Sequence, residues 1–140
     1  MRRIHERCFA MKARSAARRL ERRYDAALKP HGIGLSQFSL LTAAEATKGK
    51  ATISDIAAAL GLDRSTLSRT LAALEQRGLL RLGAETRHRA RHVEITPQGR
   101  ALLAEAERDW ERVQSAIEAR LGSEASAAEK ALARLSDAAG

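Results

Sequence analysis

Hydrophobic residues recur three or four positions apart along most of the chain, and this spacing predicts helices. The pattern indicates a first helix from about Ile4 to Leu28, and Pro30 and Gly32 are expected to end it. Ser36 is a good N-cap, so a second helix is expected from there to about Thr47. The first third of the chain is therefore predicted to be two helices with a sharp break between them.

The stretch Thr52–Leu80 predicts two shorter helices joined by a tight turn. Thr52 and Asp55 have the spacing of a capping box at the start of the first helix. Gly61 suits the left-handed turn that ends this helix, and Asp63 can cap the second one. The buried side of the second helix is predicted to consist of Leu67, Leu71 and Leu74. This arrangement is a helix-turn-helix.

A β-hairpin is predicted next, since the sequences LLRLG and RHVEIT at residues 79–83 and 91–96 have the pattern of two strands. Thr96 and Pro97 are N-cap and N1 signals for a long helix. Its hydrophobic stripe is heptad-like, which favours a partner helix, so Trp110 on this stripe is predicted in a dimer core rather than in a ligand pocket. Ser123–Asp137 is predicted to form the last helix.

Composition indicates one soluble domain over residues 1–140, because 44% of the residues are hydrophobic and only 3% are aromatic. No apolar stretch reaches the ~20 residues of a membrane span, and no signal peptide is seen, so a cytoplasmic protein is expected. The net charge of +8 favours a polyanionic partner, most often nucleic acid, although ribosomal and membrane-surface roles fit it equally well. Residues 101–140 are acidic, with five Lys or Arg against eight Asp or Glu.

The second helix of the helix-turn-helix has a polar face suited to DNA, because arginine can read guanine and hydroxyl groups can bind bases or phosphates. Its N-terminus also favours phosphate. The candidate DNA-binding residues on this face are Arg64, Ser65, Thr66, Ser68 and Arg69. An ordinary solvated face is the alternative, and the basic hairpin that follows favours recognition.

The run RHRARH at Arg87–His92 lies at the tip of the predicted hairpin. A disordered tail and a solvated edge strand are alternatives, but the flanking strands favour a wing that reaches the minor groove of DNA. The candidate DNA contacts in it are Arg87, His88, Arg89 and Arg91.

Other chemistry finds little support in the sequence. Cys8 is the only cysteine, and His5 and Cys8 lack a third soft ligand, so no metal site is predicted. His88 and His92 lie too far apart on a strand to share one ion. The carboxylates of the long helix do not converge and no nucleophile has a base, so neither an enzyme nor a cofactor is expected. A winged-helix protein for protein–protein or architectural binding is the main rival.

The chain resembles the MarR family of winged-helix transcription regulators over nearly its whole length. Three segments carry the resemblance: Tyr24–Leu41, Ile53–Leu80 and Arg91–Leu103. The resemblance implies a mainly α fold with a small β wing, in which residues 36–96 form the winged helix and residues 1–30 and 97–140 the dimerisation helices. It also implies a homodimer, a palindromic double-stranded DNA operator, and a cleft for a small-molecule effector between the two parts. The function it implies is repression that a ligand relieves.

Two details bear on this resemblance. The family commonly has an aspartate where this chain has Arg87, so the wing tip lacks that brace, and Glu85 is the remaining candidate. The sequence CFAM from Cys8 is similar to the family branch that senses organic hydroperoxides through a cysteine, with Tyr24 as a possible partner. A thiol-based redox repressor is therefore the alternative to a ligand-released one.

Overall fold

The computed structural model describes residues 6–84 and 91–139, apart from the side chain of Arg64. The elements are α2 (Phe9–Leu28), η1 (Lys29–His31), α3 (Leu35–Thr47), α4 (Ile53–Leu60), α5 (Arg64–Gln76), β1 (Leu80–Leu82), β2 (Val93–Ile95), α6 (Pro97–Leu121), η2 (Gly122–Glu124) and α7 (Ala125–Ala139). This order confirms a mainly α fold with a small two-stranded wing. None of the described helices combines the length and apolar character that a membrane span requires.

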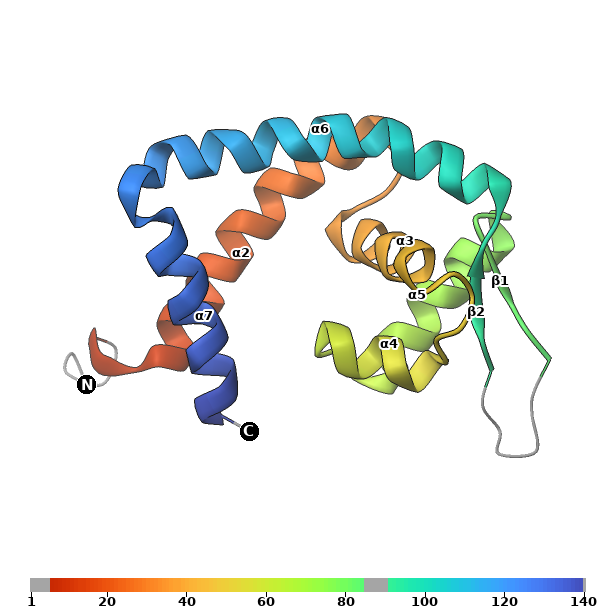
Figure 1. Ribbon diagram of the computed structural model, residues 1–140, viewed down its shortest axis with the longest axis horizontal. Coiled ribbons are helices and arrows are strands. Elements are labelled where there is room, and N and C mark those ends of the chain that lie inside the picture. Colours follow the sequence, from red (N-terminus) through yellow and green to blue (C-terminus); the bar gives the residue numbers. More distant parts are fainter. Residues whose placement is uncertain (1–5, 85–90, 140) are drawn as a thin grey trace.

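The long helix α6 forms the top of an arch (Figure 1). Helices α2 and α7 make one leg of the arch, and α3, α4, α5 and the β1–β2 hairpin make the other. Both chain ends lie in the leg formed by α2 and α7. The chain therefore separates a helical leg at its two ends from a winged helix-turn-helix in its middle.

Local capping signals determine the helix-turn-helix, as the sequence predicts. The hydroxyl of Thr52 accepts from the N–H of Asp55 at 3.2 Å, and the carboxylate of Asp55 accepts from the N–H of Thr52 at 2.8 Å. Gly61 has the left-handed backbone (φ 61°) that ends α4. The N–H of Leu62 then bonds the carbonyl of Ala57 at 3.0 Å, which closes the turn before α5.

The hairpin is antiparallel, with Leu80 opposite Ile95 and Leu82 opposite Val93. The segment before α4 extends this small sheet, because the N–H of Val93 donates to the carbonyl of Ala51 at 3.0 Å. The start of α6 packs closely against the other end of this sheet. A Cβ added at Gly99 would lie only 2.0 Å from the carbonyl oxygen of Leu79. These contacts join the wing to the helix-turn-helix and to α6.

The core lies in the winged leg and in its junction with α2 and α6. Its largest fully buried side chains are Leu28, Leu40, Leu41, Ile56, Leu67, Leu71, Leu74, Leu79, Leu80 and Val93. The predicted stripe of α5 is thus confirmed as its anchor. By contrast, α7 buries no residue within the chain, and Phe9 and Leu132 are 68% and 59% exposed.

Two predicted helix starts, those of α3 and α7, are wrong by a few residues, and the first predicted helix contains a break. Glu6 and Arg7 are helical, but Cys8 has an extended backbone, so α2 begins at Phe9. Helix α3 is capped at Gly34 rather than at Ser36, since the side chain of Gln37 accepts from the N–H of Gly34 at 3.2 Å. Helix α7 begins at Ala125, because residues 122–124 form a 3-10 turn.

Trp110, which the sequence predicts in a dimer core, packs on aromatic side chains of its own chain. Its ring stacks on Tyr24 with centroids 6.3 Å apart and on Phe38 with centroids 6.0 Å apart. The heptad-like stripe of α6 therefore packs its middle against α2 and α3 of the same chain. Further along, the stripe reaches Leu121, which is 40% exposed.

Candidate nucleic-acid interface

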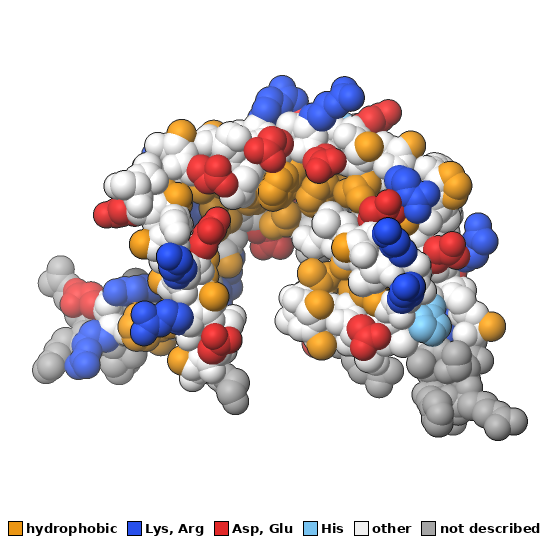
Figure 2. All heavy atoms as spheres, viewed as in Figure 1, with side chains coloured by type: hydrophobic (Ala, Val, Ile, Leu, Met, Phe, Trp, Pro, Cys, Tyr) orange, Lys and Arg blue, Asp and Glu red, His pale blue; other side chains and the backbone are white. Residues whose placement is uncertain are grey.

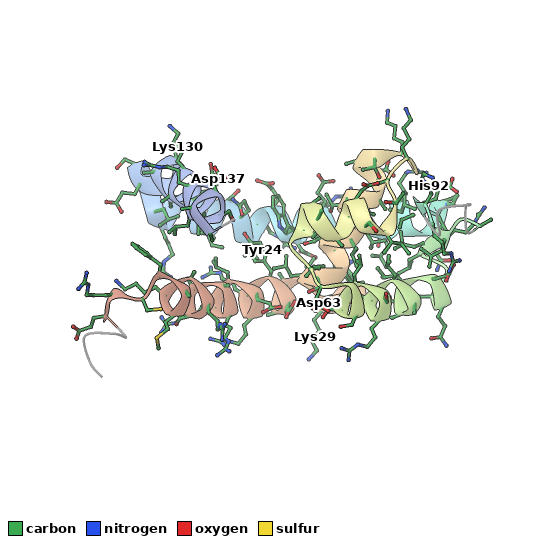
Figure 3. The ribbon with its side chains drawn as sticks, turned by 90° about the horizontal axis from the view of Figure 1, so that it is seen from below. Tyr24, Lys29, Asp63, His92, Lys130 and Asp137 are labelled. Carbon is green, nitrogen blue, oxygen red and sulfur yellow. The ribbon has the colours of Figure 1, made fainter. Side chains whose placement is uncertain are left out.

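Helix α5 presents an exposed face directly opposite its buried leucines. Successive residues of an α-helix are about 100° apart, so this opposite face consists of Ser65, Arg69, Ala72 and Gln76. All four are exposed. Figure 3 shows the helix from below, with Asp63 at its start and His92 by the hairpin beyond it. A face with arginine, serine and glutamine offers donors and acceptors to base edges.

The predicted site residues of α5 divide into two groups. The hydroxyls of Ser65 and Thr66 donate to the carboxylate of Asp63 at 2.5 and 2.7 Å, so both take part in the helix cap. Ser68 and Arg69 are exposed and lie on the second turn. Arg64 is the first residue of the helix, and its side chain lies outside the description.

Asp63 also accepts from the N–H of Thr66 at 2.9 Å, so this one carboxylate holds three donors at the start of α5. The hydrogen bonds from Ser65, and then those from Thr66, hold the pKa of this carboxyl far below its usual 3.8. The charged form of Asp63 is thus the form that orders the first turn of the candidate recognition helix.

This lowered pKa predicts a pH dependence for the stability that Asp63 contributes. The folded-state pKa is depressed, so the contribution is fully present above the unfolded-state pKa and declines as pH falls below about 4. The variant Asp63→Asn should therefore lower the urea midpoint relative to wild type at about pH 7, and this difference should shrink at about pH 3. An equal difference at the two pH values would contradict the role of the charge.

The base of the wing is held by Arg91, one of the predicted DNA contacts. Its Nε donates to the carbonyl of Gly83 at 3.0 Å, and its guanidinium also reaches the carbonyl of Leu82 at 3.4 Å. The side chain is half-buried and lies against the opposite strand. This contact braces the hairpin where it leaves the sheet. Arg87, His88 and Arg89, and Glu85 as the predicted brace, lie outside the described residues.

Two groups of exposed residues, one on α5 and one near the hairpin, were not predicted as site residues. Gln76 continues the row of Ser65 and Arg69 at helical spacing, and that spacing was the available signal. Lys48 and Lys50 lie at the end of α3, and the carbonyl of Lys50 is 3.1 Å from Nδ1 of His92. Only the folded chain brings them to the hairpin, and Figure 2 shows basic side chains gathered there.

Two sets of polar contacts hold the junction between the two legs. Nε2 of His31 lies 2.7 Å from a carboxylate oxygen of Asp109 on α6, and Arg112 contacts the same carboxylate. From the other side, Arg77 at the end of α5 donates to the carbonyl of Gly32 at 2.7 Å. We call His31, Gly32, Arg77 and Asp109 the junction clamp. Because His31 and Gly32 are neighbours in the segment before α3, the clamp connects Asp109 on α6 to Arg77 at the end of α5.

A cavity of about 390 Å³ lies between α3 and α6, close to the junction clamp. It is lined by Phe38, Thr42, Glu45, Ala46, Leu103, Glu107 and Trp110. Figure 2 shows hydrophobic side chains on the underside of α6 between the legs, with acidic side chains along its edge. The volume is that of a small-molecule site.

The structure does not bring Cys8 and Tyr24 together within one chain. They lie 16 residues apart at the two ends of one helical rod, which corresponds to ~24 Å. The Tyr24 hydroxyl instead donates to Gln114, and burial raises the pKa of that hydroxyl. Among residues 6–84 and 91–139, no three His, Cys, Asp or Glu side chains form a metal-binding group.

Known proteins resemble this chain over most of its length. A family model described as the MarR family matches residues 31–91. The M. tuberculosis transcriptional regulator MosR is 34% identical, with 96% of this chain and 97% of MosR covered and a TM-score of 0.87. MosR in complex with DNA matches at 36% identity, over 94% of this chain and 96% of that one, with a TM-score of 0.85.

A third solved structure, the transcriptional repressor CouR bound to p-coumaroyl-CoA, is 27% identical over 97% of this chain and 94% of its own, with a TM-score of 0.77. Among curated proteins, none is significantly similar to the chain. The identity to MosR extends over almost the full length of both chains, and the family model matches the helix-turn-helix described above. The chain therefore belongs to the MarR family of transcriptional regulators.

Proposed function

We propose that the protein is a dimeric, sequence-specific DNA-binding repressor that a small molecule releases from its operator. The observation that carries this proposal is the exposed polar face of α5, anchored by three buried leucines and ordered at its start by Asp63. MosR has been solved with DNA, and CouR with a 23-mer duplex. The proposed role is binding, with no catalytic step.

In the proposed complex, α5 enters the major groove and Arg69 reads a base, together with Arg64, Ser68 and Gln76. The wing residues Arg87, His88 and Arg89 contact the flanking minor groove or its phosphates, while Arg91 braces the hairpin. Lys48 and Lys50 add phosphate contacts beside the wing. Base contacts come from the helix and affinity from both elements.

The proposed dimer uses residues 1–30 and 97–140, which leaves residues 36–96 to bind DNA. Three features support it: Phe9 is 68% exposed, Leu132 is 59% exposed, and α7 buries no residue within one chain. Phe9, Leu132 and Leu135 line one apolar groove between α2 and α7. A second copy that covers this groove would remove an exposed hydrophobic surface from water.

The proposed release acts through the junction clamp. Glu107 and Trp110 line the cavity, and Asp109 lies between them on α6. A ligand that shifts this turn of α6 also shifts Asp109 against His31, next to Gly32, whose carbonyl accepts from Arg77 at the end of α5. Occupancy of the cavity would thereby change the position of the two recognition helices relative to the operator spacing.

Selection of genomic DNA fragments on the purified full-length protein tests the proposal. The enriched fragments should share a palindrome whose half-sites lie about ten base pairs apart, because a symmetric dimer presents two recognition helices to one face of the duplex. Sedimentation of the protein with the selected duplex should give two chains per palindrome. Enrichment of fragments without a common sequence would refute sequence-specific recognition.

A further inference from the structure

The cavity between α3 and α6 has one aromatic wall. The rings of Phe38 and Trp110 stack with centroids 6.0 Å apart and 17° between their planes, and Tyr24 supports Trp110 from α2. Phe38 is 7% exposed, so this wall is held by the core rather than by solvent-exposed side chains. An ordered aromatic wall favours a ligand with a flat apolar group or a cation above a ring.

The charged groups of the cavity are both carboxylates. Glu45 accepts from Nε of Arg100 at 2.9 and 3.0 Å, so its charge is compensated. Glu107 is exposed at the rim and makes no hydrogen bond or ion pair with the part of the chain that the structure describes. No lysine or arginine lines the cavity. The cavity is therefore negative, and its uncompensated charge is that of Glu107.

We propose that this cavity takes an aromatic or hydrophobic cation, such as a substituted ammonium, and discriminates against carboxylates. The apolar part lies on Phe38 and Trp110, and the cationic group lies between the face of Trp110 and the carboxylate of Glu107. A carboxylate in the same place meets the like charge of Glu107 and finds no lysine or arginine in the lining of the cavity to pair with. This inference deepens the proposed function, because it names the ligand class of the proposed effector site.

Three probes of similar size and different charge test the ligand class: benzylammonium, benzyl alcohol and phenylacetate. Trp110 is the only tryptophan of the chain, so its fluorescence reports binding in the cavity without DNA. The cation should bind at least about tenfold more tightly than benzyl alcohol, and phenylacetate more weakly than either. A phenylacetate affinity equal to that of the cation overturns the proposal, and so does the absence of cation binding.

The substitution Glu107→Gln should lower the affinity for the cation to near that for benzyl alcohol and leave benzyl alcohol binding unchanged. Glu105→Gln removes the same charge two residues away, at an exposed position outside the cavity, and should change neither affinity. A cation preference that survives Glu107→Gln overturns the proposal. The fluorescence readout needs no operator DNA, so it tests the ligand class separately from the proposed function. If the protein binds the cation but stays bound to its operator, the release mechanism is refuted and the ligand class is not.

Discussion

Replacing Arg69 by alanine is expected to weaken operator binding by roughly 30-fold to 10⁴-fold at fixed salt. Loss of one good arginine contact to a base costs about 1–3 kcal/mol, and a symmetric dimer loses it in both half-sites, which makes about 2–6 kcal/mol. Arg69 carries this expectation because it lies opposite Leu67, Leu71 and Leu74 on an exposed face. Fluorescence anisotropy with the selected palindrome measures the change.

The matched control is Arg108→Ala, which removes the same charge from an exposed position on α6. It should leave operator affinity within about threefold, because a charge that makes no phosphate contact contributes only a screened field. The contact of Arg69 should also be confined to one base pair of each half-site. Changing this base pair should therefore lower the operator affinity of wild type strongly and that of Arg69→Ala only slightly. Equal losses for the two arginine variants would mean that α5 supplies charge only.

Replacing Leu71 by alanine is expected to lower the free energy of unfolding by about 2–5 kcal/mol. Leu71 is 1% exposed and belongs to the stripe that holds α5 against the rest of the core. The substitution removes buried apolar surface and leaves a cavity that the surrounding helices can fill only in part. Urea unfolding at a fixed protein concentration measures the loss, since dimerisation makes the apparent stability depend on concentration.

Ser68→Ala provides the comparison on the same helix. Ser68 is exposed, so its replacement should change the free energy of unfolding by no more than about 0.5 kcal/mol. A Leu71→Ala variant as stable as Ser68→Ala would show that α5 is not anchored by this stripe.

The helix-turn-helix and the wing could be predicted from sequence because their signals are local. Thr52 and Asp55 cap each other across three residues, and Gly61 supplies a left-handed backbone at one position. Such features depend on neighbours in the chain, so residue type and spacing suffice to locate them. The same holds for the stripe of Leu67, Leu71 and Leu74.

The contacts that join the two legs could not be predicted in the same way. His31 meets Asp109 across 78 positions, and Arg77 meets Gly32 across 45. Trp110 lies on a stripe whose periodicity is the same for a partner chain and for α2 and α3 of its own chain. Periodicity indicates which face of a helix is buried but does not indicate what covers it.

The prediction of the N-cap of α3 was wrong for a related reason. Ser36 has the residue type of an N-cap, yet Gly34 occupies this position because Gln37 and Asp25 bind the first free N–H groups. Asp25 comes from the preceding helix, so the start of α3 is determined partly by tertiary structure. N-cap propensity depends on residue type alone, so it favours Ser36 and does not include the carboxylate of Asp25.

Titration of the protein with the selected palindrome and with a scrambled duplex of the same length and composition tests the central claim most directly. At one salt concentration near physiological, the palindrome should bind about 10³-fold or more tightly, because base contacts by α5 add to the phosphate contacts that both duplexes offer. Equal affinities for the two duplexes, with equal dependence on salt, would contradict the claim that this protein reads DNA sequence.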